Sequence, residues 1–205
     1  RHPQIKIFND AVEQFFVKEL KPHVEEWREA GAVPREVWYQ AAEQGLLLVS
    51  APEEYGGAGG DFRHDAVIIE QLEKQGIAGF GIGLHNAIVA PYIIHYGSDE
   101  QKQRLLPKLA SGDLVCAIAM TEPGTGSDLQ NIKTTAKKDG NGYVINGSKT
   151  FITNGQTANL VLVCAKTDPT KGAKGISIMM VETDEVDGFE RGRNLKKIGQ
   201  PAADT

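Results

Sequence analysis

The sequence contains little that would bind a metal ion or form disulfides, with two cysteines and five histidines in 205 residues. Cys116 and Cys164 both lie in apolar, strand-like runs, which is typical of buried, reduced thiols in a reducing compartment. A disulfide between them is the weaker alternative. No group of cysteines and histidines has the spacing of zinc ligands, so we predict no metal site.

Long apolar runs and dense tracts of positive charge are also absent. No run approaches the roughly 20 residues that a membrane-spanning helix needs, so we predict no integral membrane segment. The formal charge is -5 and no tract is rich in Lys and Arg, which argues against a nucleic-acid partner. Hydrophobic residues make up 40% of the chain, enough for a sizeable core in a water-soluble protein.

The hydrophobic pattern changes near residue 112, which predicts an α+β fold with two domains. Residues 1–112 have helical spacing, and residues 113–205 consist of short β-rich runs. In the first part, apolar side chains recur at helical spacing across 12–20, and a second helix is expected to start with Pro34 just inside it and to end at Gly45. The glycine-rich stretch 51–60 is predicted to be a loop.

Three more helices are expected before the strands begin. In the first of these, the residues predicted to face inward are Ala66, Ile69 and Leu72. The next runs through 84–89, and Pro91 is expected to kink it. The last begins with a capping box formed by Ser98 and Gln101 and ends near Gly112.

The second half predicts strands separated by turns. The expected strands are Val115–Met120, Tyr143–Asn146, Thr150–Ile152, Leu160–Lys166 and Ile176–Val181. The pairs Asn141-Gly142 and Asn146-Gly147 are typical of hairpin turns.

The most informative segment runs from Cys116 to Gly155. An apolar strand leads into the small-residue turn Thr-Glu-Pro-Gly-Thr-Gly-Ser-Asp at 121–128, and the segment closes with Phe-Ile-Thr-Asn at 151–154. Either fragment alone favours a structural interpretation, a tight turn or a core aromatic. Both fragments in this order, with hairpin signals between them, favour a binding site.

This segment resembles the flavin-binding signature of the acyl-CoA dehydrogenases. Tyr55-Gly56-Gly57, the run 96–113 and the run 192–199 are similar to further landmarks of that family, so the resemblance covers nearly the whole chain. It implies the family's N-terminal helical domain at 1–112 and most of its middle domain, which is antiparallel and β-barrel-like, at 113–205. It also implies that the family's C-terminal four-helix domain is missing.

The resemblance implies a bound FAD. The residues expected to contact FAD are Ile118, Ala119, Met120, Thr121, Gly126, Ser127, Phe151, Ile152 and Thr153. The Thr121 hydroxyl would lie near flavin N5, and Phe151 against the ring face. The Gly-Thr-Gly-Ser turn can bring its amides close to a phosphate because glycine has no Cβ. Ser127 is also expected to contact the pantetheine arm of the acyl-CoA substrate. Many members carry Trp where Phe151 stands, so docking of electron-transfer flavoprotein is expected to differ in detail.

The implied reaction is α,β-dehydrogenation of an acyl-CoA thioester, as in the β-oxidation of fatty-acid or branched-chain acyl groups. A carboxylate removes the α-proton and hydride leaves the β-carbon for the flavin. The family's base is a Glu of the C-terminal domain. No residue here matches it, Glu122 included, so we assign no catalytic residue and expect residues 1–205 alone to be inactive.

The resemblance further implies electron-transfer flavoprotein as partner, a homo-oligomer (tetramer or dimer), and a bacterial cytoplasmic or mitochondrial matrix location. Acyl-CoA oxidases and flavin-dependent monooxygenases share the fold and remain alternatives, as does a non-catalytic CoA- or flavin-binding module.

The run 79–83 lacks the spacing of a dinucleotide loop and is expected to serve close packing or a helix start. His85 is expected to be structural, with a place near the acyl pocket as the alternative.

Overall fold

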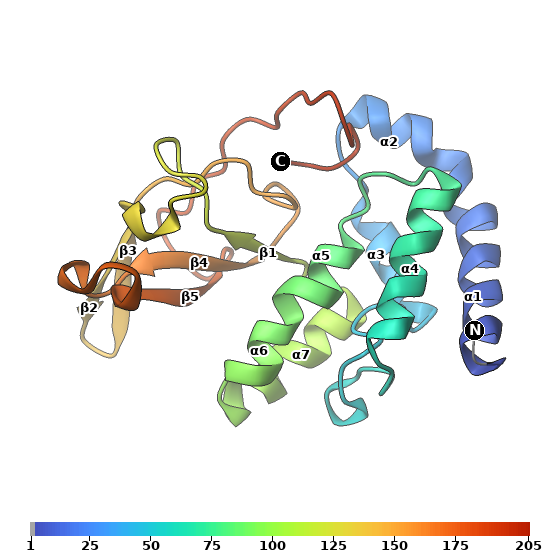
Figure 1. Ribbon diagram of the computed structural model, residues 1–205, viewed down its shortest axis with the longest axis horizontal. Coiled ribbons are helices and arrows are strands. Elements are labelled where there is room, and N and C mark those ends of the chain that lie inside the picture. Colours follow the sequence, from blue (N-terminus) through green and yellow to red (C-terminus); the bar gives the residue numbers. More distant parts are fainter. Residues whose placement is uncertain (1–2) are drawn as a thin grey trace. The chain divides into compact units, whose positions relative to one another are not determined.

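The computed structural model describes residues 3–205. Helices occupy the blue-to-green part of the chain and strands the yellow-to-red part (Figure 1). Contacts divide the chain into two compact units. The first, called the helical unit below, contains the residues up to Val115 together with Gly192–Asp204; the second, called the strand unit, contains Cys116–Arg191 and Thr205.

The helical unit contains seven α-helices within the described residues: α1 (Pro3–Phe15), α2 (Val24–Ala30), α3 (Arg35–Glu43), α4 (Phe62–Gln75), α5 (Ile82–Leu84), α6 (Ala90–Tyr96) and α7 (Asp99–Ser111). A π-helical turn at Phe16–Leu20 follows α1, and a second one at His85–Val89 joins α5 to α6. Pro91 has no amide hydrogen and lies in the first turn of α6. A wider, π-helical turn lies immediately before this proline, at the position where the sequence predicted a kink.

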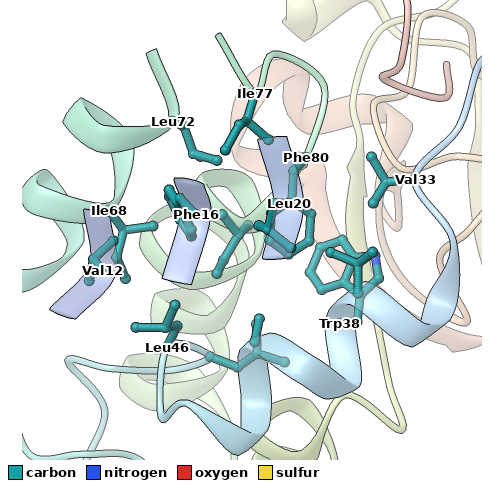
Figure 2. Close-up of a cluster of buried hydrophobic side chains, with 14 of the residues drawn as sticks. Val12, Phe16, Leu20, Val33, Trp38, Leu46, Ile68, Leu72, Ile77 and Phe80 are labelled. Atoms are coloured by element: carbon teal, nitrogen blue, oxygen red, sulfur yellow. The ribbon is translucent and has the colours of Figure 1, made fainter. Parts of the chain in front are cut away.

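The core of the helical unit is a cluster of buried apolar side chains from α1, α3, α4 and the segments that follow them (Figure 2). Phe16, Leu20 and Trp38 are large members of the cluster and have at most 2% of their surface exposed. The Trp38 ring meets the Phe80 ring edge-on, with centroids 4.9 Å apart. Burial of these large side chains is the main stabilising contribution to the unit.

The predicted inner face of α4 is confirmed at Leu72 and wrong at Ala66 and Ile69. Ala66 and Ile69 are exposed, Ile69 by 38%, whereas Val67, Ile68 and Leu72 are buried. The polar residues Asp65 and Gln71 share the buried side of this helix. Because two core-facing positions carry polar side chains, the apolar pattern alone pointed to the neighbouring face.

Helix ends follow the signals that the sequence carries. Ser98 accepts a hydrogen bond from the Gln101 amide at 3.2 Å, and the Gln101 side chain accepts from the Ser98 amide at 2.8 Å, so the predicted capping box is confirmed. Leu105, Leu106 and Leu109 of α7 are fully buried, and Gly112 follows in the left-handed region at φ 82°. Pro34 is the N-cap of α3, whereas the sequence predicted it just inside the helix; α3 therefore begins one residue later than predicted.

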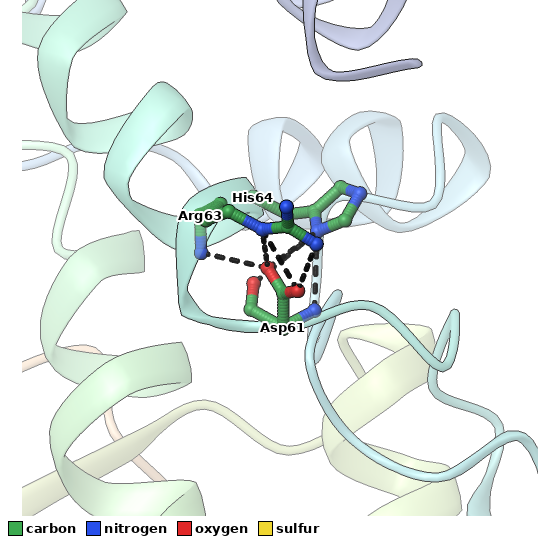
Figure 3. Close-up of polar contacts among 3 residues, drawn as sticks. All are labelled: Asp61, Arg63 and His64. Atoms are coloured by element: carbon green, nitrogen blue, oxygen red, sulfur yellow. Dashed lines mark hydrogen bonds and ion pairs between the residues drawn. The ribbon is translucent and has the colours of Figure 1, made fainter. Parts of the chain in front are cut away.

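A second capping box, which the sequence pattern did not indicate, starts α4 (Figure 3). Asp61 accepts from the Arg63 amide at 2.9 Å, and the His64 ring accepts from the Asp61 amide at 3.1 Å. The Arg63 guanidinium lies 2.6 Å from the Asp61 carboxylate. These hydrogen bonds from Arg63 hold the pKa of Asp61 at about 2.

The strand unit contains one mixed sheet of β1 (Cys116–Ala119), β2 (Thr135–Asp139), β3 (Gly142–Asn146), β4 (Leu160–Lys166) and β5 (Ile176–Glu182). β4 pairs in parallel with β1 and, through Thr135 and Lys166 alone, with β2. The pairs β2–β3 and β4–β5 are antiparallel.

The strand unit therefore differs from the expected antiparallel β-barrel-like domain. The long connection 120–159 between β1 and β4 permits a parallel pair, which a tight hairpin would not. Among the described residues, no pairing joins β3 or β5 back to β1, so the sheet does not close. The α+β class itself, with helices followed by strands, is confirmed.

One of the two predicted hairpins is present. The turn between β2 and β3 is Gly140-Asn141, one residue before the predicted pair, with Gly140 at φ 55°. The second, at Asn146-Gly147, is absent: β3 ends at Asn146, and among the described residues it pairs with β2 and with no strand that follows it. A Cβ on Gly147 would lie 2.2 Å from the Thr134 hydroxyl, so this glycine serves close approach and not a hairpin.

The predicted strand Thr150–Ile152 is also absent. Phe151 and Asn154 have left-handed φ values of 58° and 62°, which interrupt an extended backbone. β2 was missed because its residues, Thr-Ala-Lys-Lys-Asp, carry little apolar character. Within residues 3–205, no helix combines the length and the apolar content needed to cross a bilayer.

Candidate functional site

Hydrogen bonds bring the two ends of the Cys116–Gly155 segment together within the strand unit. The Thr150 amide donates to the Thr121 carbonyl at 2.9 Å. The Asn154 side chain donates to the Cys116 carbonyl at 3.1 Å. Residues 149–154 therefore lie along β1 and its continuation, and they place Phe151 close to Thr121.

Alternation along β1 divides its side chains between the two faces of the sheet. Ala117 and Ala119 face a small apolar cluster with Val161 and Val163, and Ile152 packs against this cluster. By the same alternation Ile118 faces the other side of the sheet, where it is buried with 8% of its surface exposed. Ala119 is 2% exposed and can offer a ligand only its backbone, whereas Met120 is half-buried.

The turn after β1 is closed by its own backbone. Glu122 and Thr125 exchange two backbone hydrogen bonds of 2.9 and 3.0 Å, and Gly126 and Ser127 follow on the surface. Apart from the two chain neighbours of Gly126, no residue that the structure describes has an atom within 4 Å of the place that a Cβ on this glycine would occupy. The packing of the chain therefore does not require glycine at this position, which leaves room for a ligand to approach the backbone.

Glu122 is a buried anchor of this turn. Its carboxylate accepts hydrogen bonds from the Lys133 amide at 2.6 Å, from the Thr134 amide at 2.9 Å and from the Thr134 hydroxyl at 2.5 Å. The Lys149 ammonium lies 3.0 Å away. Burial alone would raise the pKa of Glu122, but these donors outweigh it and hold the pKa at about 2. The carboxylate is therefore ionised and fully engaged, which does not suit a general base.

Phe151 combines an exposed ring with an unusual backbone. It is 69% exposed, and its φ of 58° is rare for a residue with a bulky side chain. A conformation of this kind costs roughly 1–3 kcal/mol and is found preferentially at functional sites. Phe151 thus presents a flat apolar ring to the surface, on a backbone that follows the residue bonded to Thr121.

Three hydroxyl groups of the segment are available to a ligand. Among the hydrogen bonds that join the described residues, none engages the side chain of Thr121, Ser127 or Thr153. Thr121 and Thr153 are half-buried, and Ser127 is exposed. Hydroxyls, an open glycine turn and an exposed ring are what a flat ring system with polar edges and phosphate groups requires, so these residues fit FAD.

The remaining candidate residues have structural roles. His85 is fully buried, and its ring Nε2–H donates to the Leu109 carbonyl at 3.0 Å. Burial lowers the pKa of His85 to about 4, so the ring is neutral. Gly79, at φ 113°, lies so close to the backbone of Ala203 that a Cβ would be 2.5 Å from its nitrogen. Gly81 is the N-cap of α5, which confirms close packing and a helix start for this run.

The two cysteines differ in burial. Cys116 is buried, Cys164 is half-buried, and they form no disulfide. Among residues 3–205, no three His, Cys, Asp or Glu side chains are grouped so that they could hold a metal ion.

Comparison with known families decides what the segment belongs to. Residues 2–113 match the family described as acyl-CoA dehydrogenase, N-terminal domain, and residues 117–205 match acyl-CoA dehydrogenase, middle domain. The chain belongs to the acyl-CoA dehydrogenase family. Its relatives include the mitochondrial long-chain specific acyl-CoA dehydrogenase of Sus scrofa, 47% identical over 97% of this chain and 46% of that protein.

Solved structures of the family agree with the fold. An acyl-CoA dehydrogenase from Geobacillus kaustophilus is 50% identical with a TM-score of 0.96, covering 100% of this chain and 54% of that one. An acyl-CoA dehydrogenase complexed with FAD from Bacillus anthracis is 34% identical with a TM-score of 0.88, covering 100% of this chain and 35% of that one. This chain thus spans about half the length of the curated relatives it matches. The assignment of individual residues to FAD stays a prediction.

Proposed function

We propose that this chain supplies flavin-contacting residues to an FAD-dependent dehydrogenase that oxidises acyl-CoA thioesters between the α and β carbons. The observation that carries the proposal is the hydrogen bond between the Thr150 amide and the Thr121 carbonyl. It joins the two halves of the resemblance into one surface. That surface presents an exposed ring and available hydroxyl groups, and FAD is present in a solved relative.

The residues that would hold FAD divide by chemistry. Thr121 and Thr153 would donate or accept hydrogen bonds at the polar edge of the ring system, with the backbone of Ile118, Ala119 and Met120 beside them. Phe151 and Ile152 would cover apolar surface and exclude water. The amides of Gly126 and Ser127 would face a phosphate or the pantetheine arm of the substrate. When bound, FAD would supply a two-electron acceptor, which no side chain of this sequence can replace.

The proposed reaction needs a base that these residues do not provide. Glu122 lies beside the proposed flavin surface, but its carboxylate is ionised and held by Lys133, Thr134 and Lys149. We therefore place the base outside residues 1–205 and propose that these residues alone do not oxidise acyl-CoA. The test is to express residues 1–205, add FAD and an artificial electron acceptor, and assay acyl-CoA oxidation. Turnover equal to that of the complete protein would refute this part of the proposal.

The same proposal includes a substrate class, an electron acceptor, an assembly and a location. The named Sus scrofa relative supports a long-chain acyl-CoA as substrate. Electron-transfer flavoprotein would receive the electrons, a homotetramer or homodimer would be the assembly, and the location would be the bacterial cytoplasm or the mitochondrial matrix. Titration of the complete protein with saturated acyl-CoAs of increasing length tests the substrate class. Faster reduction by a short or branched acyl group than by long chains would contradict it.

The central experiment is an anaerobic titration. The complete protein that contains this chain is purified, its FAD content is measured, and a saturated acyl-CoA is added without oxygen. Bleaching of the flavin absorption with formation of the enoyl-CoA is the expected result. Rapid reoxidation by oxygen would favour the oxidase or monooxygenase alternative. Bound FAD that no acyl-CoA reduces would favour a binding module, and protein that cannot be loaded with FAD would overturn the proposal.

A further inference from the structure

A buried ion pair links the two halves of the proposed flavin surface. The Lys149 ammonium donates to the Met120 carbonyl at 2.9 Å and to the Glu122 carboxylate at 3.0 Å. The side chains are 11% exposed for Lys149 and 5% exposed for Glu122. Glu122 directly follows Thr121 in the sequence, and Lys149 precedes Phe151 by two positions, so the pair bridges both segments.

Three successive residues are fixed by these contacts. The Met120 carbonyl is held by Lys149, the Thr121 carbonyl by the Thr150 amide, and the Glu122 carboxylate by Lys149 and by the amides of Lys133 and Thr134. The backbone on both sides of Thr121 is therefore held, whereas its hydroxyl bonds to no residue that the structure describes. A group prepared in this way can meet a ligand without first losing conformational freedom.

Stability alone does not account for a buried ion pair at this place. Two buried charges lose their hydration, and well-packed apolar residues of similar volume often stabilise a fold at least as well. The Lys149 ammonium instead makes directional contacts to the Met120 carbonyl oxygen and to the Glu122 carboxylate at the same time. These contacts fix the geometry of 120–122 relative to 149–151.

We infer that Lys149 and Glu122 are positioning residues, which hold Thr121 and Phe151 in the arrangement that binds the flavin. The inference rests on the proposed function above, because it needs FAD at Thr121 and Phe151. It extends that proposal to two residues that do not themselves face the ligand.

The test uses the complete protein and measures FAD affinity by fluorescence titration of the apoprotein, together with the absorption spectrum of the bound flavin. Lys149→Met is expected to raise the Kd for FAD about tenfold, equivalent to 1.4 kcal/mol, and to alter the shape of the flavin band. Lys149→Arg keeps the charge and the donors and is expected to restore most of the affinity. Glu122→Gln is also expected to raise the Kd for FAD. This variant replaces Lys149→Met in the test if Lys149→Met does not fold.

Two controls separate positioning from loss of stability. Lys171→Met removes an exposed ion pair of the same type, 3.0 Å from Asp168, and is expected to leave the Kd and the spectrum unchanged. Val12→Ala reduces the packing of the core of the helical unit, which contains none of the residues proposed to contact FAD. It is expected to lower the melting temperature with little change in Kd. An equal loss of FAD affinity in Val12→Ala and Lys149→Met at equal stability would overturn the inference.

A double-mutant cycle gives the decisive result. If Lys149 acts by positioning Thr121, the loss of FAD affinity caused by Thr121→Ala shrinks strongly in the Lys149→Met background. Additive losses would show that Lys149 acts independently of Thr121 and would refute the inference. The proposed function would survive that outcome, because the wild-type protein would still bind FAD; wild-type protein without FAD affinity would refute both.

Discussion

The Thr150 amide donates a 2.9 Å hydrogen bond to the Thr121 carbonyl, although 28 residues lie between the two in the printed sequence. The connection between them contains the turn 122–128 and the β2–β3 hairpin, and it returns the chain to the end of β1. This contact converts two short motifs into one surface. The predictions below concern that surface and the elements that support it.

Thr121→Ala is expected to weaken FAD binding by about 0.5–1.5 kcal/mol, because one neutral hydrogen bond to the flavin is lost. The apoprotein should keep its melting temperature, since the hydroxyl bonds to no described residue. Fluorescence titration and thermal unfolding measure the two effects. Thr170→Ala, at an exposed threonine that bonds to Asp168, is the control and should not change the affinity. Unchanged FAD affinity in Thr121→Ala would count against the site.

Phe151→Gly and Phe151→Ala are expected to separate strain from binding. Both remove the ring and should weaken FAD binding to a similar extent. The glycine variant should be the more stable of the two by about 1 kcal/mol, because glycine adopts a φ of 58° without steric cost and alanine does not. Urea unfolding of the two apoproteins gives the difference. A more stable alanine variant would contradict the left-handed conformation at this position.

The lowered pKa of Glu122 leads us to predict that the folded protein loses stability in acid. Its pKa falls from an ordinary 4.5 to about 2 in the folded protein, so the folded state favours the ionised carboxylate. The resulting stabilisation is complete above about pH 4.5 and is lost as the pH falls toward 2. The wild type should therefore exceed Glu122→Gln in melting temperature near neutral pH, and the gap should close on acidification. A gap that stays constant from pH 7 to pH 3 would show that Glu122 is not held in its ionised form.

Ser98→Ala is expected to destabilise the protein by about 1 kcal/mol, because the N-cap of α7 loses its acceptor for the Gln101 amide. Ser98→Asp keeps an acceptor and adds a negative charge at the helix N-terminus, so it should retain wild-type stability. Thermal unfolding of both variants provides the measurement. Equal losses in the two variants would show that the cap contributes nothing.

Parts of this fold with strong local signals could be predicted from the sequence. The capping box at Ser98 needs only residues three positions apart, and β4 was predicted at Leu160–Lys166 as observed because its apolar run is continuous. Ala66 and Ile69 of α4 were wrongly predicted to face inward, because Asp65 and Gln71 occupy buried positions through contacts with distant residues, such as the 3.0 Å hydrogen bond from Gln71 to Asn9. The capping box at Asp61 was missed because His64 stands where Glu or Gln is usual.

The candidate site divides in the same way. The residue types at 118–121, 126–127 and 151–153, and their order, are properties of the sequence, and they sufficed to indicate the acyl-CoA dehydrogenase family. Whether the strands pair in parallel or antiparallel, the left-handed backbone of Phe151 and the ion pair of Lys149 with Glu122 depend on contacts between segments far apart in the chain. Local patterns carry no information about such contacts, because burial and hydrogen-bond partners exist only once the chain has folded. The sequence by itself thus determined which groups are present, and the tertiary structure decided which of them are held in place and which remain available to a ligand.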